Sequence, residues 1–237
     1  MINPSESRIA PRIEVVRRRI ELACRAAGRP VDAVTLLAVS KTQPDAAIRA
    51  AVAAGQRDFG ENYAQELLTK MDALADQPIR WHFIGHLQRN KAKKLVPRLY
   101  ALHTLDSPRL VEAMLPHLHG RERPLQIYVQ VNVAGEAQKS GVAPAELAEM
   151  LAAIPLHPGL ELCGLMTMPP FDVDPTPHFV ELARLLERHR SALPPEQQLT
   201  FSGLSMGMSD DFERAIGCGS TVVRLGTVLF GPRQGGT

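Results

Sequence analysis

Short apolar runs alternate with helical patterns along most of the chain. From Val34 onward, nearly continuous apolar segments are separated by longer segments in which apolar residues recur every three or four positions, the spacing of an amphipathic helix. The predicted strands are Val34–Val39, Arg57–Glu61, Arg80–Ile84, Leu99–His103, Leu125–Val131, Leu160–Met166, Thr200–Leu204 and Thr221–Leu225. The predicted helices are Pro44–Ala54, Tyr63–Leu74, Gln88–Leu95, Ser107–Leu118, Pro144–Ala153, Thr176–Ala192 and Ser209–Ile216. Strands that are apolar throughout are typical of a parallel sheet covered on both faces.

About eight βα units are the number that closes a TIM barrel. A further helix is predicted before the first strand, where five apolar residues have helical spacing: Ile9, Ile13, Val16, Ile20 and Cys24. No linker-like change of composition divides the 237 residues. We therefore predict one domain over residues 1–237, an α/β fold with a single (β/α)8 TIM barrel and an additional N-terminal helix. The alternative is an open doubly wound sheet, which would more naturally have a Gly-rich fingerprint where this chain has Ser40–Pro44.

Composition and charge remove several classes of partner. The net charge of +2 is too small to indicate nucleic acid or an anionic membrane. The start of the chain is polar and no apolar run is long enough to span a bilayer, so we expect a cytoplasmic protein without a membrane partner. The three cysteines have no C-x-x-C spacing, which favours reduced thiols. His82 and His86 lack further converging ligands, so we expect hydrogen-bonding roles and no metal.

A lysine follows the first predicted strand. Alternation along that strand places Leu37, Val39 and Lys41 on one face, which points into the core. Desolvation lowers the pKa of a lysine, and a neutral amine forms a Schiff base with an aldehyde or ketone. Taken alone, Ser40-Lys41-Thr42 would favour a surface lysine just beyond the strand. The ends of the other strands favour the reactive interpretation.

The candidate site residues lie at or just beyond the carboxyl ends of the predicted strands, the end of a TIM barrel where active sites lie. The residues in these positions are Lys41, Asn62, His86, Asn132, Met166, Ser205, Met206, Gly207, Ser209, Arg224, Gly226 and Thr227. Gly207 and Gly226 allow close backbone approach, and hydroxyls nearby can donate to a phosphate. Ser209 is also predicted to cap the following helix. Either loop alone would favour an ordinary Gly/Ser capping turn, and it is their joint position that favours a phosphate site.

Arg224 interrupts an apolar strand and needs acceptors when buried. A bound anion or a ring nitrogen would be such an acceptor. Because arginine keeps its proton, a pyridine nitrogen facing Arg224 would be unprotonated, and such a ring is a poor electron sink.

Several motifs together closely resemble the pyridoxal phosphate homeostasis protein family (the YggS or PROSC family), whose barrel is like the N-terminal domain of alanine racemase. The motifs are Ala38–Thr42, Phe59–Tyr63, Trp81–Lys91, Val131–Asn132, Lys139–Gly141, Gly164–Met168, Leu204–Ser209 and Val223–Gly226. The resemblance implies an aldimine between Lys41 and pyridoxal 5′-phosphate, with Arg224 near the pyridine nitrogen. It implies that Ser205, Gly207, Gly226 and Thr227 help to hold the phosphate, in loops that include Met206 and Ser209. It also places Asn62, His86, Asn132 and Met166 near the cofactor.

The same resemblance implies a role rather than a reaction. The protein would bind, store or deliver pyridoxal phosphate, possess no catalytic residues, and have pyridoxal phosphate-dependent apoenzymes as transient acceptors. A racemase would need a second domain with an opposing base, for which we expect no room in this chain. Two alternatives stay open: a small pyridoxal phosphate-dependent amino-acid racemase or lyase, and a cofactor-free Schiff-base aldolase acting on a phosphorylated substrate.

Overall fold

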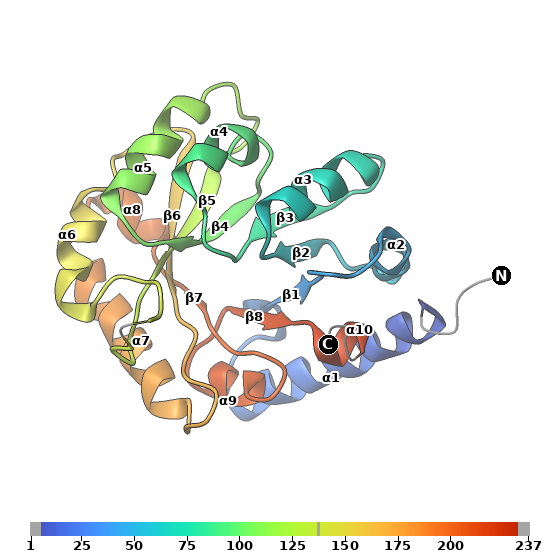
Figure 1. The fold of residues 1–237 in the computed structure, drawn as a ribbon. Helices are drawn as coiled ribbons and strands as arrows, with labels where there is room; N and C mark the ends of the chain where they lie inside the picture. The colour runs from blue at the N-terminus through green and yellow to red at the C-terminus, as the bar shows by residue number, and fades with distance from the viewer. Residues whose placement is uncertain (1–5, 137, 232–237) are drawn as a thin grey trace.

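Eight parallel strands close into a barrel in the computed structural model, which describes residues 6–136 and 138–231 (Figure 1). Each strand pairs with the next in chain order, and β8 pairs with β1. The strands are β1 Thr35–Val39, β2 Asp58–Glu61, β3 Arg80–Phe83, β4 Ala101–Leu105, β5 Leu125–Gln130, β6 Leu160–Met166, β7 Gly203–Ser205 and β8 Val222–Leu225. The predicted barrel is confirmed. The ends of the predicted domain, residues 1–5 and 232–237, lie outside the described residues.

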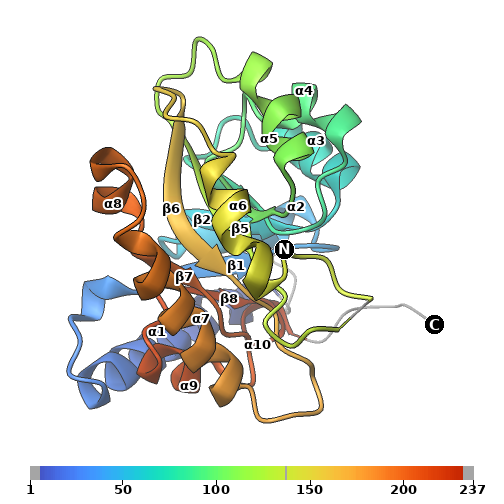
Figure 2. The same ribbon diagram turned by 90° about the vertical axis from the view of Figure 1, so that its left-hand side faces the viewer.

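Helices surround the barrel on its outer side (Figures 1 and 2). They are α1 Ile9–Ala26, α2 Asp45–Ala53, α3 Ala64–Ala73, α4 Ala92–Leu95, α5 Pro108–Met114, α6 Leu147–Ala152, α7 Thr176–Arg190, α8 Pro195–Thr200, α9 Phe212–Gly217 and α10 Thr227–Phe230. The five apolar residues that predict the N-terminal helix are all buried in α1. Helix α1 contacts α2, α9 and α10, so the start of the chain covers the side where the barrel closes.

Some predicted boundaries are wrong for physical reasons. The segment Thr200–Leu204 is not all strand, because Thr200 ends α8, where its hydroxyl donates to the carbonyl of Gln197 at 3.3 Å. Ser209 does not cap α9. That helix begins at Phe212 after Asp211, whose Oδ1 accepts the backbone N–H of Met208 at 2.6 Å.

Three predicted helices are each a short 3-10 turn joined to an α-helix. The turns are η3 Arg89–Lys91 before α4, η4 Leu115–His117 after α5 and η5 Pro144–Glu146 before α6. Two further 3-10 turns, η1 Glu6–Arg8 and η2 Val31–Ala33, flank α1. Helices α8 and α10 were not predicted.

Side chains alternate between two layers along the strands. On β1, Leu36 and Ala38 join the main core between the sheet and the helices, whereas Leu37 and Val39 pack in a smaller cluster inside the barrel. The inward direction predicted for Leu37 and Val39 is thus confirmed. The inner cluster also contains Ile84, Tyr128, Cys163, Met166 and Val222. Buried polar side chains occupy much of the remaining interior, and several of them belong to the candidate site described below.

Candidate functional site

Lys41 lies at the carboxyl end of β1, as predicted from the sequence. The backbone N–H of Ser40 donates to the carbonyl of Gly60 at 3.0 Å, which extends the pairing of β1 with β2 to the residue before Lys41. The side chain of Lys41 is half-buried. The lysine therefore follows an ordered strand end at the barrel mouth.

A buried group of charged side chains anchors the residue before Lys41. Lys70 on α3 donates its Nζ to Glu61 Oε1 at 2.8 Å, to Glu66 Oε1 at 2.6 Å and to the carbonyl of Ser40 at 2.7 Å. The Ser40 hydroxyl in turn donates to Glu61 Oε1 at 2.6 Å. Burial raises the pKa of Glu61, although Lys70 and Ser40 act in the opposite direction. We call Ser40, Glu61, Glu66 and Lys70 the Lys70 cluster.

The same cluster holds the residue after Lys41. Thr42 has φ +64°, a left-handed conformation that is unfavourable for a β-branched residue. Its backbone N–H donates to Glu66 Oε1 at 2.6 Å. Lys41 is therefore fixed between Ser40, a member of the Lys70 cluster, and Thr42, which is bonded to that cluster. The strain at Thr42 lies next to the predicted reactive lysine.

Arg224 occupies the interior beside β1. It is only 4% exposed, and its position on β8 pairs with Leu37. Its Nη1 donates to Ser205 Oγ and its Nη2 to the carbonyl of Thr167, both at 2.8 Å. A guanidinium has five N–H donors, so at most three remain for other acceptors. Burial lowers the pKa of Arg224 to about 10, with Asp211 opposing the shift, and the group stays protonated at neutral pH.

The two glycine-containing loops lie side by side. The backbone N–H of Arg224 donates to the carbonyl of Gly207 at 2.9 Å, which joins the loop after β7 to β8. Gly207 has φ +98°, and a Cβ there would come within 2.7 Å of Ala215 Cβ on α9. A Cβ at Gly226 would lie 3.2 Å from the carbonyl oxygen of Val39. The loops predicted to hold a phosphate therefore converge near the end of β1.

The other predicted residues differ in how they face this mouth. Met166 is fully buried in the inner cluster, whereas Met206 is buried in the outer core on the helix side. Asn62 is half-buried, and its Oδ1 is buried with no hydrogen-bond partner among the described residues. Ser209 is half-buried and Thr227 is exposed at the start of α10.

Asn132 and His86 have protein partners of their own. Asn132 Nδ2 donates to the carbonyl of Glu136 at 2.8 Å, and its Oδ1 accepts the Glu136 N–H at 3.2 Å. His86 is exposed, with Nδ1 3.4 Å from Asp106 Oδ2, and lines a cavity of about 730 Å³ between the loops after β3 and β4. Contacts of all twelve predicted residues with a cofactor stay predictions.

Sequence reasoning missed the supporting residues. Lys70 shares a buried face of α3 with Leu67 and Met71. Its helical spacing with these apolar residues is a sequence signal that could have indicated a buried lysine. His103 lies inside the barrel on β4, and its partner Ser205 is 102 positions away, a pairing that no local pattern indicates. His82 has hydrogen-bonding roles, as predicted, with Asp58 and His103.

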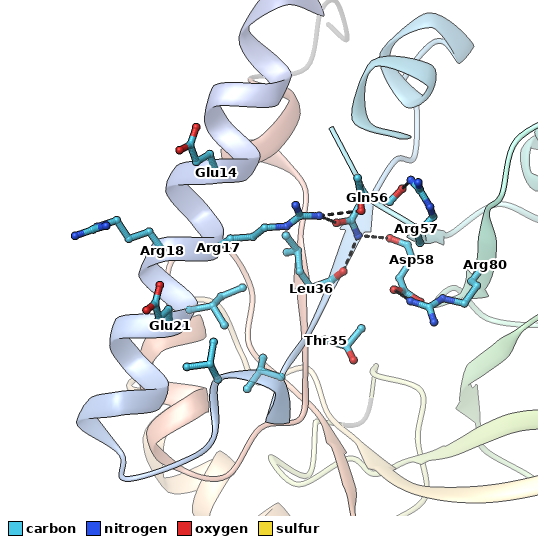
Figure 3. Close-up of a pocket in the computed structure, with 14 residues that line it drawn as sticks. Glu14, Arg17, Arg18, Glu21, Thr35, Leu36, Gln56, Arg57, Asp58 and Arg80 are labelled. Carbon is cyan, nitrogen blue, oxygen red and sulfur yellow. Dashed lines mark hydrogen bonds and ion pairs between the residues drawn. The ribbon is translucent and has the colours of Figure 1, made fainter. Parts of the chain in front are cut away.

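A second cavity lies at the opposite end of the strands. It has a volume of about 620 Å³ and is lined by α1 and the starts of β1, β2 and β3 (Figure 3). Two of its arginines are engaged by the protein: Arg17 donates to the carbonyls of Ala54 and Gly55, and Arg80 pairs with Asp58. Because active sites of TIM barrels lie at the carboxyl ends of the strands, the Lys41 mouth is the better candidate.

Within the described part of the chain, no His, Cys, Asp and Glu side chains gather in a group of three or more that could hold a metal ion. No helix in that part is both long and apolar enough to cross a membrane.

The fold and the site define a class of protein. A family model described as alanine racemase, N-terminal domain, matches residues 13–234. An alanine racemase from Corynebacterium glutamicum has a TM-score of 0.67 and 15% identity, covering 93% of this chain and 62% of that chain, a likeness of fold alone.

More similar proteins narrow the class. The pyridoxal phosphate homeostasis protein of Pseudomonas aeruginosa is 46% identical over 230 residues, 97% of this chain and 98% of that protein. The structure of PipY from Synechococcus elongatus with PLP bound has a TM-score of 0.77 and 34% identity, covering 91% of this chain and all of that one. The chain belongs to the pyridoxal phosphate homeostasis protein family, within the alanine racemase N-terminal-domain class.

Proposed function

We propose that this protein binds pyridoxal 5′-phosphate as an aldimine of Lys41 and serves intracellular pyridoxal phosphate homeostasis without catalytic turnover. The observation that carries the proposal is the convergence of three features at one end of the barrel. These are the anchored Lys41, the buried protonated Arg224 and the paired loops of Gly207 and Gly226. The names of the relatives and the PLP-bound PipY structure support the same ligand.

The residues present fit this ligand group by group. A lysine amine matches the aldehyde, and the Arg224 guanidinium can donate to the ring nitrogen. Close-approaching glycine loops with hydroxyls suit the phosphate. The buried Oδ1 of Asn62, unpaired among the described residues, is the kind of group that a bound molecule satisfies.

Arg224 also supports the carrier role. When bound, pyridoxal phosphate can act as an electron sink, provided that its ring draws charge from the substrate. A partner that stays protonated keeps the ring nitrogen unprotonated and weakens this effect. The proposal includes a cytoplasmic location, typical of reduced cysteines, and delivery of the cofactor to pyridoxal phosphate-dependent apoenzymes.

The direct experiment is borohydride reduction of the protein loaded with pyridoxal phosphate, followed by peptide mapping. We expect visible absorption that survives gel filtration and bleaches on reduction. Peptide mapping should then find the reduced pyridoxyl group on Lys41. Lys41→Ala should lose the absorption, whereas Lys94→Ala, on the exposed face of α4, should keep it. Label found chiefly on another lysine would overturn the assignment.

A second measurement separates a carrier from an enzyme. We expect α-proton exchange of common amino acids, followed by NMR in deuterated water, to stay near the rate with free pyridoxal phosphate. Exchange well above that rate, abolished by Lys41→Ala, would identify a racemase or lyase. A colourless protein whose lysine is trapped only with a phosphorylated carbonyl substrate would instead indicate an aldolase.

A further inference from the structure

Five buried side chains form a continuous hydrogen-bonded line across the inside of the barrel. Arg224 Nη1 lies 2.8 Å from Ser205 Oγ, which lies 2.8 Å from His103 Nδ1. His103 Nε2 lies 2.9 Å from His82 Nδ1, and His82 Nε2 lies 3.1 Å from Asp58 Oδ1. The five residues come from β8, β7, β4, β3 and β2. We call them the interior chain.

The chemistry of its two ends fixes the direction of every hydrogen bond. A guanidinium only donates and a carboxylate only accepts. If each imidazole carries one proton, His82 must donate from Nε2 to Asp58 and accept at Nδ1 from His103 Nε2. His103 Nδ1 then accepts the proton of the Ser205 hydroxyl, so Ser205 Oγ presents a lone pair to Arg224. All donors point from Arg224 toward Asp58.

The surroundings keep both histidines neutral. Burial lowers the pKa of His103, and the nearby His82 and Arg224 lower it further. Burial also lowers the pKa of His82, with Arg80 adding to the shift and Asp58 opposing it. Tyrosine rings cover both imidazoles, since His103 stacks on Tyr128 with centroids 4.5 Å apart and His82 lies 5.2 Å from Tyr100.

The far end of the interior chain is also paired. Asp58 forms an ion pair with Arg80, which lines the cavity at the amino ends of the strands (Figure 3). Burial would raise the pKa of Asp58, but its hydrogen bonds with His82 and Arg80 lower it overall. Because this carboxylate is fixed at one end, all hydrogen bonds of the interior chain run in the same direction.

We propose that the interior chain is a positioning device for Arg224, in which Asp58, His82 and His103 hold the Ser205 hydroxyl as an obligatory acceptor. Together with the carbonyl of Thr167, which accepts from Nη2, Ser205 fixes the guanidinium at two points. Its remaining N–H groups are then oriented for an aromatic ring nitrogen, a step that rests on the proposed function. Ser205 thereby becomes a positioning residue of Arg224, distinct from the phosphate-binding role that the sequence predicts.

The first test needs no cofactor. Imidazole ¹⁵N NMR of the apoprotein at neutral pH should show His82 and His103 both as neutral rings protonated at Nε2. His82→Gln and His103→Gln assign the two signals. A charged ring, or an Nδ1-protonated tautomer of His103, would overturn the proposed polarity.

The second test compares two substitutions at one position. In His103→Gln, the carboxamide can offer an oxygen to Ser205 and an N–H to His82, whereas His103→Leu offers neither in a similar volume. We expect His103→Leu to weaken pyridoxal phosphate binding about tenfold and to change the absorption spectrum of the bound cofactor. His103→Gln should restore both toward wild type. A purely structural role would lower the melting temperature without changing the bound spectrum.

Ser205→Ala provides a variant that removes only the link next to Arg224, and it keeps the test decisive if His103→Leu does not fold. We expect the same spectral change as in His103→Leu. If wild-type protein fails to bind pyridoxal phosphate, the proposed function is wrong while the NMR still decides the interior chain. If it binds, and Ser205→Ala and His103→Leu match wild type in affinity and spectrum, the positioning role is overturned and the function stands.

Discussion

Strand β2 carries one acidic residue to each side of the barrel wall, and the two serve opposite kinds of network. Glu61 joins the Lys70 cluster outside the barrel, where three charged side chains meet. Asp58 ends the interior chain, where neutral imidazoles separate the carboxylate from Arg224. The charged cluster fixes the backbone on both sides of Lys41, and the neutral chain orients a side chain. The Lys70 cluster thus stabilises the loop that carries Lys41, whereas the interior chain sets the orientation of Arg224.

The charged network should be the more costly to break. Lys70→Met keeps the apolar stem but leaves the buried Glu61 and the half-buried Glu66 without their cation. We expect the free energy of unfolding to fall by about 3–5 kcal/mol, the usual effect of removing one partner of a buried ion pair. Urea denaturation measures it.

Two comparisons sharpen this expectation. Lys94→Met on the exposed face of α4 should change the free energy of unfolding by less than about 0.5 kcal/mol. His103→Leu, which breaks the neutral chain, should cost about 1–3 kcal/mol, the penalty for unsatisfied buried groups. Equal losses for Lys70→Met and His103→Leu would remove the distinction between the networks.

The two networks should also respond to pH with opposite signs. Burial holds the pKa values of His82 and His103 below their ordinary value of 6.5, so the unfolded chain binds more protons below about that pH. Their contribution to stability is therefore present above pH 6.5 and is lost as pH falls. The pKa of Glu61 is raised above 4.5, so its contribution is present below that pH and is lost as pH rises through the raised pKa.

Denaturation between pH 5 and pH 8, as rough limits around the histidine range, separates these contributions. Wild type should lose stability toward pH 5. His103→Gln should lose less because one titrating group is gone, and Glu61→Gln should lose more because the opposing contribution is removed. Parallel curves for all three proteins would contradict this assignment of signs.

The fold was largely predictable because a parallel barrel repeats one pattern, and each apolar run marks a strand that both layers bury. The strand pattern also indicated Lys41, by its phase with Leu37 and Val39, and Arg224, as a charged residue that interrupts an apolar strand. Helices α8 and α10 were not predicted because their six and four residues are too few to establish a helical period of apolar positions. The networks were not predicted because their partners are far apart in the sequence and are brought together by the tertiary structure. Ser40 meets Glu61 through the pairing of β1 with β2, and His103 meets Ser205 across the barrel interior.

The smallest expected effect concerns Thr42, where the Lys70 cluster offsets a strained backbone. Asparagine tolerates the left-handed conformation better than a β-branched residue and keeps the N–H that donates to Glu66. Thr42→Asn should therefore raise the free energy of unfolding by about 0.5 kcal/mol. Thr42→Val retains the branching and the N–H, and should bring no gain. If both variants gave the same stability in urea, the left-handed geometry at Thr42 would not be a source of strain, and the Lys70 cluster would have nothing to offset there.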